Sequence, residues 1–153
     1  MNIRKASYED LSEVHRLVRE LAIYEKAEHE FIATLEDYQK NWKSGVYEAV
    51  VAENDAGRIV GMALYYLTYS TWKGRMLYLE DFVVDTAYRK QGIGQLLFDG
   101  FIAAAKEKKC NLVKWQVLDW NEPALQFYIK NGATIEKEWW NGKIIFSSDT
   151  GEV

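Results

Sequence analysis

The feature that most constrains the fold is a junction between an apolar strand and an amphipathic helix. The apolar residues at 79–84 lead into a turn, 85–94, that contains two cations and two glycines. From residue 92 to residue 108 apolar side chains recur at helical spacing. Junctions of this kind are typical of sheets with helices packed on them, so the sequence predicts an α/β fold.

The rest of the chain predicts the order β-α-α-β-β-β-α-β-α-β-β. Three successive hairpin-linked strands favour antiparallel pairing, and the later β-α-β unit favours parallel pairing. We therefore predict a mixed, mainly antiparallel sheet with helices on both faces, in a single domain over residues 1–153. Helices are expected over 8–24, 34–45, 92–108 and 122–131, strands over 3–6, 47–53, 58–69, 76–84 and 112–118, and a final hairpin over 133–138 and 143–147 with Asn141-Gly142 at its turn.

Composition excludes several classes of protein. The formal net charge of −4 argues against a nucleic-acid-binding module. No apolar run approaches the roughly 20 residues of a membrane span, and the N-terminus lacks the apolar stretch of a signal peptide. With Cys110 as the only cysteine, we expect a cytoplasmic location and no intrachain disulfide. Two histidines and one cysteine also make a Cys/His metal site improbable, so no metal is expected.

The turn at 85–94 has the properties of an anion site. Its glycines, Gly92 and Gly94, let backbone N–H groups approach a ligand closely, and the helix that follows directs unpaired amides at the same point. Arg89 and Lys90 add full positive charges. Together these groups predict a diphosphate site. A tight turn with glycines for packing is the structural alternative, while the third glycine of a dinucleotide fingerprint and the Gly-Lys-Ser/Thr of a P-loop are missing.

Two motifs resemble those of a known superfamily. Arg-x-x-Gly-x-Gly at 89–94 is similar to the acyl-CoA signature of the GNAT acetyltransferases. The run 119–133 is similar to their later motif, in which an Asn precedes a helix that carries Phe-Tyr and ends in Gly. Nearly the whole chain resembles the spermidine/spermine and thialysine N-acetyltransferases. The run 69–75 looks more like the thialysine branch, since Ser70 stands where the polyamine branch typically has an acidic residue.

This resemblance implies an N-acetyltransferase that uses acetyl-CoA as cosubstrate and forms a homodimer. It places the coenzyme's pyrophosphate on the turn and its pantetheine beside Asn121. Tyr128 is expected near the sulfur and is the candidate general acid that protonates the leaving thiolate. The coenzyme-binding residues expected in this way are Phe82, Val83, Val84, Arg89, Lys90, Gln91, Gly92, Ile93, Gly94, Gln95, Asn121, Ala124 and Tyr128.

The acceptor chemistry centres on two adjacent carboxylates, Glu80 and Asp81. A primary ammonium has a pKa near 10, so an amine acceptor must be held as a cation and then deprotonated. We assign Glu80 as the general base and expect backbone amides at 82–84 to stabilise the developing oxyanion. Because neighbours in a strand face opposite sides, we expect only one of the two carboxylates to line the acceptor site.

Tyr24, Glu25 and Trp72 are candidates to bind the far end of the acceptor through charge and cation–π contact. The sequence therefore favours direct acetyl transfer to a small cationic amine, such as a thialysine- or lysine-like amino acid, a diamine or a polyamine. Two alternatives stay open. One is acetylation of a protein lysine or N-terminal amine, and the other is a non-catalytic acetyl-CoA-binding sensor or interaction module.

Overall fold

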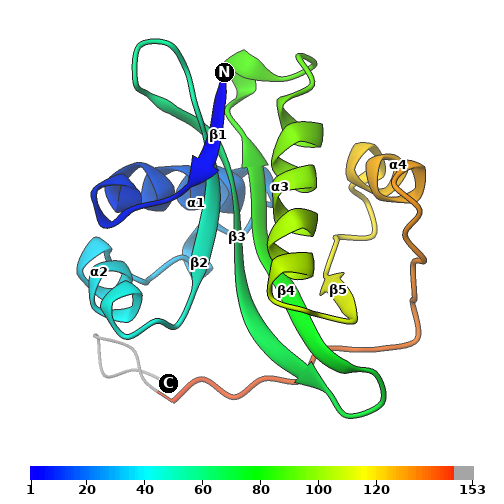
Figure 1. The fold of residues 1–153 in the computed structure, drawn as a ribbon. Coiled ribbons are helices and arrows are strands. Elements are labelled where there is room, and N and C mark those ends of the chain that lie inside the picture. Colours follow the sequence, from blue (N-terminus) through cyan, green and yellow to red (C-terminus); the bar gives the residue numbers. More distant parts are fainter. Residues whose placement is uncertain (147–153) are drawn as a thin grey trace. The chain divides into compact units, whose positions relative to one another are not determined.

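The computed structural model describes residues 1–146, and the chain divides into two compact units, Met1–Gln116 and Val117–Val153. The prediction of one domain over the whole chain stays a prediction. The first unit contains a five-stranded sheet in the order β1-β2-β3-β4-β5 (Figure 1). Its elements are β1 (Asn2–Lys5), α1 (Leu11–Tyr24), α2 (Leu35–Lys43), β2 (Glu48–Glu53), β3 (Ile59–Ser70), β4 (Gly74–Val84), α3 (Ile93–Glu107) and β5 (Leu112–Trp115), and the second unit contains α4 (Glu122–Lys130).

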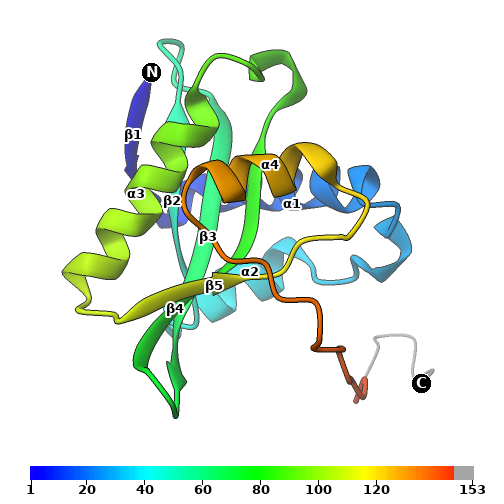
Figure 2. The same cartoon turned by 90° about the vertical axis from the view of Figure 1, so that its right-hand side faces the viewer.

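The sheet is mixed, as predicted. Strands β1 to β4 pair antiparallel and β5 pairs parallel with β4. Helices α1 and α2 lie on one face of this sheet and α3 lies on the other (Figures 1 and 2). The predicted α/β fold class, a mixed and mainly antiparallel sheet with helices on both faces, is therefore confirmed.

Both faces of the central strands are buried, which explains why β2 and β3 are apolar at nearly every position. Val51 and Met62 belong to the core that α1 covers. On the opposite face Tyr65 packs against Phe101 of α3, with ring centroids 5.7 Å apart. Strands covered on both faces have continuous apolar sequences, whereas strands with one solvated face alternate.

Two predicted elements differ in the structure. The strand expected over 112–118 ends at Trp115. The hairpin expected over 133–138 and 143–147 is not formed within the described residues: 133–146 contain no strand, and residue 147 lies outside that range. Trp140 and Phe146 are 93% and 90% exposed. The physical reason is that a two-stranded hairpin without a further strand or a packed helix is at best marginally stable in water.

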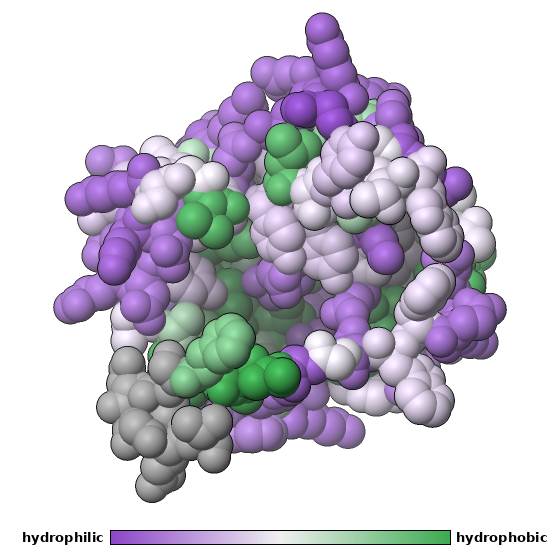
Figure 3. Space-filling model, turned by 90° about the horizontal axis from the view of Figure 1, so that it is seen from below, coloured by the Kyte–Doolittle hydropathy of each residue, from purple (hydrophilic) through white to green (hydrophobic). Residues whose placement is uncertain are grey.

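The surface of the described residues is largely polar. Figure 3 shows one face on which hydrophilic residues predominate and hydrophobic residues form separate patches. Within 1–146 no helix is long and apolar enough to cross a membrane.

An ion-pair cluster fastens the N-terminal strand to the start of α1. Asp10 is 9% exposed and accepts two hydrogen bonds from the Arg4 guanidinium, at 2.7 and 3.0 Å. The same carboxylate accepts the Ser7 backbone N–H at 2.8 Å, and Arg4 also donates to Glu53 at 3.1 Å. The hydrogen bonds from Arg4 hold the pKa of Asp10 below its usual value.

This cluster predicts that Asp10→Asn lowers the free energy of unfolding at pH 7 by about 1–3 kcal/mol, because it removes a charge-assisted pair from a buried position. Since the folded-state pKa is depressed, the stabilisation is present above the pKa of the unfolded state and is lost as the pH falls through the folded-state value. Urea unfolding between pH 3 and pH 8 measures both. The control is Glu107→Gln at the exposed Lys5–Glu107 pair, 3.5 Å, expected to cost under about 0.5 kcal/mol. Equal losses in the two variants would contradict the account.

Candidate functional site

Strand β4 changes its pairing partway along its length. Its parallel ladder with β5 ends at the pair Leu79–Trp115, whereas its antiparallel ladder with β3 continues to the pair Gly61–Val84. Among the described residues, one edge of the segment 80–84 therefore has no strand partner. An edge that no further strand covers is a place where a ligand can approach the backbone.

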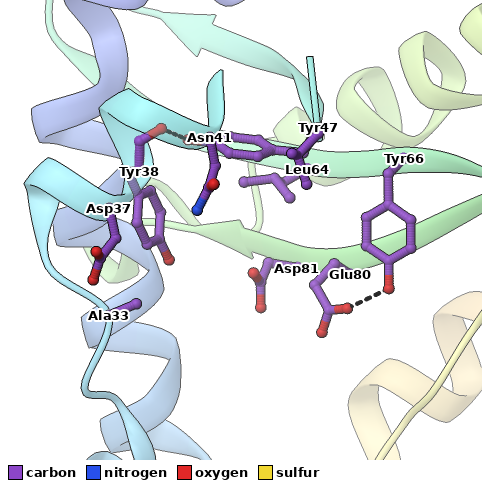
Figure 4. A pocket seen from close by; sticks show the side chains of 10 residues that line it. Ala33, Asp37, Tyr38, Asn41, Tyr47, Leu64, Tyr66, Glu80 and Asp81 are labelled. Atoms are coloured by element: carbon purple, nitrogen blue, oxygen red, sulfur yellow. Dashed lines mark hydrogen bonds between the residues drawn. The ribbon is translucent and has the colours of Figure 1, made fainter. Parts of the chain in front are cut away.

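Strand β4 also contains a β-bulge at Glu80. Leu64 lies opposite Asp81 and Tyr65 lies opposite Leu79, so Glu80 is an extra residue without a partner on β3. A bulge interrupts the alternation of side chains along a strand. As a result, both Glu80 and Asp81 line the same hollow (Figure 4). The expectation that only one of these carboxylates lines the site is wrong.

The hollow has a volume of about 210 Å³ and lies between α2 and strands β3 and β4 (Figure 4). No lysine or arginine is among its lining residues. Helix α2 contributes three of them, Asp37, Tyr38 and Asn41, from a stretch of the sequence that is mostly polar. The lining residues are Ala33, Asp37, Tyr38, Asn41, Val46, Tyr47, Leu64, Tyr66, Glu80 and Asp81.

The sequence analysis missed Asp37, Tyr38, Asn41 and Tyr66 as residues of this site. The only signal for the first three is their spacing at i, i+1 and i+4, which places Asp37 and Asn41 on one side of a helix. That spacing does not distinguish a site wall from a solvated face. Tyr66 lies in β3, and its neighbour Glu80 on β4 could not be predicted without the register between the two strands.

The electrostatics of the hollow are dominated by acidic groups. Burial, reinforced by the charges of Glu80 and Glu25, raises the pKa of Asp81 to about 7. Burial also raises the pKa of Glu25. Within the described residues, the carboxylate of Asp81 makes no hydrogen bond or ion pair. The hollow thus presents negative charge that has no cation of its own.

Tyrosine side chains complete the walls. The Tyr66 hydroxyl donates to Glu80 Oε1 at 2.7 Å, and its ring stacks on Tyr78 with centroids 5.5 Å apart. Burial, reinforced by this hydrogen bond, raises the pKa of Tyr66 well above its usual value, so the phenol stays protonated. Burial raises the pKa of Tyr38 in the same way. Neutral aromatic rings beside carboxylates are a favourable environment for an alkylammonium group.

The glycine-rich turn begins where β4 ends. Gly92 is the N-cap of α3 and has φ of 81°, in the left-handed region that glycine adopts without strain. The 15-residue helix α3 starts immediately after it, so its first-turn amides are directed at the turn. Arg89 donates from Nε to the Val84 carbonyl at 3.3 Å and lies 5.3 Å from the centre of the Tyr24 ring. This geometry fits an anion such as a diphosphate.

The structure brings some of the predicted acceptor residues together and leaves others apart. Glu25, Glu80 and Asp81 act on one another electrostatically. Tyr24 is in contact with Arg89 and does not line the hollow. Trp72, in the turn between β3 and β4, is 84% exposed and does not line it either.

The second unit contains the predicted helix α4 with its predicted cap. The Asn121 side chain accepts the Ala124 backbone N–H at 3.4 Å, and a proline stands in the first turn. Tyr128 is buried, with its ring centroid 5.7 Å from that of Phe127. The coenzyme contacts expected for Asn121, Ala124 and Tyr128 stay predictions.

Comparison with known proteins identifies the family of the chain. The sequence profile of the acetyltransferase (GNAT) family matches residues 11–133. The chain belongs to this family. It is a GNAT-family N-acetyltransferase that depends on acetyl-CoA, and it is related to thialysine and diamine acetyltransferases.

Individual GNAT relatives match over most of their length. A Bos taurus protein named thialysine N-epsilon-acetyltransferase is 38% identical over 150 residues, which cover 91% of this chain and 88% of the relative. The Mus musculus protein of the same name is 36% identical over 149 residues, with 90% and 88% covered. The structure of a tetramutant of the BH1408 protein from Bacillus halodurans aligns with a TM-score of 0.77 and 25% identity, and covers 94% of this chain and 100% of that chain.

The raised pKa of Asp81 predicts that this carboxylate lowers the free energy of unfolding near neutral pH. Because the folded-state pKa of Asp81 is raised, its contribution to stability is full below the unfolded-state pKa near 4 and is lost as the pH rises to about 7. Asp81→Asn is therefore expected to raise the free energy of unfolding at pH 8, by at most about 4 kcal/mol, and to change it little at pH 4. Denaturant unfolding at both pH values measures this. Destabilisation at pH 8 would contradict the raised pKa.

Proposed function

We propose that this GNAT enzyme transfers the acetyl group of acetyl-CoA to the primary amine of a small cationic acceptor: a thialysine- or lysine-like amino acid, a diamine or a polyamine. The observation that carries the proposal is the Asp81 carboxylate, which is partly buried, lies beside Glu80 and has no cationic partner in the described residues. Burying an unpaired carboxylate is costly, and an ammonium group from a substrate would offset that cost. The names of the bovine and mouse relatives support an amino-acid acceptor.

The size of the hollow favours a small acceptor. Its volume of about 210 Å³ is below the ~300 Å³ at which pockets for drug-sized ligands begin. Its lining carries carboxylates and tyrosines and no basic side chain, so a cation is favoured over an anion throughout. The whole protein's localisation in the cytoplasm and its assembly as a homodimer belong to this proposal as expectations from the family.

The cosubstrate would be held by two features of the first unit. The first-turn amides of α3, with Arg89 and Lys90, would bind the pyrophosphate, and backbone amides of β4 at 82–84, beyond the end of its ladder with β5, would donate to the polar groups near the thioester. When bound, acetyl-CoA supplies an activated acetyl group as a thioester. Gln91, Ile93, Gly94 and Gln95 complete this proposed set, with Asn121, Ala124 and Tyr128 from the second unit.

Proton removal is assigned to the Glu80–Asp81 pair. Glu80 remains the proposed general base, and the Tyr66 hydroxyl holds its carboxylate in place. Asp81 binds the incoming ammonium and, with a pKa of about 7, has a proton affinity suited to base catalysis near neutral pH. Tyr128 is proposed to return a proton to the leaving thiolate.

A panel of acceptors tests this proposal. Release of free thiol from acetyl-CoA is followed with thialysine, lysine, putrescine, spermidine and a lysine-containing peptide, compared by kcat/KM. We expect selective turnover of a free small amine. Glu80→Gln and Tyr128→Phe are each expected to lower kcat by about 10²–10⁴ because each removes a proton-transfer group.

The matched control is Glu36→Gln, which removes an exposed carboxylate of α2 that does not line the hollow and should leave kcat/KM within about twofold. Turnover of the peptide alone would assign the enzyme to protein acetylation. Coenzyme binding without turnover of any acceptor would support the sensor alternative. Either result would overturn the small-amine proposal.

A further inference from the structure

His15 of α1 has no role in the chemistry described so far, yet it contacts two residues that line the hollow. Its Nε2 lies 2.9 Å from the carbonyl oxygen of Ala33. Its ring lies edge-on to that of Tyr38, with centroids 4.9 Å apart. Both Ala33 and Tyr38 line the hollow, so one side chain of α1 touches its wall at two points.

The segment that carries Ala33 is held by single contacts of its residues and not by a helix or a strand. Residues 31–34 connect a short 3-10 turn, 28–30, to α2 and have no regular secondary structure. Phe31, at the start of this segment, also packs on the histidine, with ring centroids 4.8 Å apart. The imidazole thus contacts two aromatic rings while it reaches the backbone.

The hydrogen bond also identifies the form of the imidazole. A carbonyl oxygen only accepts hydrogen bonds, so Nε2 of His15 must carry the hydrogen and donate it. The bond links α1 directly to the residue before the N-cap of α2, Thr34, whose side chain accepts the Asp37 N–H at 3.1 Å. Helix α2 therefore starts from a point that α1 fixes.

The far side of Tyr38 is held independently. The Tyr47 hydroxyl donates to the Tyr38 carbonyl at 2.7 Å, and burial keeps the Tyr47 pKa high, at about 12. The backbone carbonyl of Tyr38 is thus held by Tyr47, the residue before β2, while its ring contacts the rings of both His15 and Tyr47. Loss of the imidazole would remove one of these ring contacts together with the hydrogen bond to Ala33 and leave the Glu80–Asp81 wall unchanged.

We propose that His15 is a positioning residue for the acceptor: by holding Ala33 and Tyr38, it sets the shape of the wall opposite Glu80 and Asp81 and therefore the KM for the amine. This inference rests on the proposed function of the hollow. None of the contacts of His15 described above reaches the turn or residues 80–84 of β4. Its effect is therefore confined to the acceptor.

Two variants separate the hydrogen bond from the ring contact. His15→Phe keeps an aromatic ring and removes the donor, and His15→Gln keeps a donor at similar reach and removes the ring. For His15→Phe we expect the KM for the preferred amine to rise about 3–10-fold, the effect of one lost hydrogen bond. We expect kcat and the KM for acetyl-CoA to stay within about twofold. His15→Gln should restore the acceptor KM to within about threefold of the natural enzyme.

The control is Leu11→Ala, which destabilises α1 from a buried position outside these contacts. Its acceptor KM should not rise, although its melting temperature falls. If Leu11→Ala raises the acceptor KM as much as His15→Phe, the effect is general loosening and the proposal is wrong. An unchanged acceptor KM in His15→Phe, or equal changes in both KM values, also overturns it. Absence of turnover by the natural enzyme overturns the proposed function itself and, with it, this inference.

Discussion

The interruption of strand pairing along β4 is the constraint on which the rest of the site depends. Up to Leu79 the strand is bonded on both edges, and beyond it only β3 remains as a partner. The bulge at Glu80 falls at the same point and turns two successive carboxylates to one hollow. These two irregularities end the cover by β5 along one edge of 80–84 and bring two carboxylates to one hollow, just before the turn that leads to α3. The proposed binding of the thioester and the amine relies on both.

The acidic hollow is maintained at a cost in stability. A carboxylate whose pKa is raised to about 7 is less stable in its ionised form in the folded protein than in the unfolded chain. The packing on both sheet faces and the Arg4–Asp10 cluster at the start of α1 offset this cost. Sites of acid–base chemistry commonly lower the stability of the fold, because they hold charged groups in positions where those groups are poorly solvated. A lysine or arginine inside the hollow would neutralise the carboxylates and remove this cost, but none is among the lining residues.

The sequence predicted those parts of the structure that follow from local pattern. Helical spacing and hairpin turns gave the mixed sheet and its helices, and the glycines marked the start of α3. The alternation rule failed at Glu80 and Asp81 because a bulge depends on the register between β3 and β4. Tyr38 and Asn41 were missed because the packing of α2 beside the sheet turns an apparently solvated face into a wall. The prediction of a final hairpin was wrong within the described residues because strand propensity alone does not supply a further strand or helix for it to pack on.

The central claim is that the Asp81 carboxylate binds the ammonium group of the acceptor. Carbon-13 NMR of the aspartate side chains, assigned with Asp81→Asn, measures the pKa of Asp81 with and without saturating acceptor in the presence of non-acetylated coenzyme A. The account predicts a pKa near 7 in the free enzyme that falls by at least one unit when the amine binds, because an adjacent ammonium favours the ionised form. An Asp81 pKa that is ordinary in the free enzyme, or that does not move when an amine is bound, would contradict it.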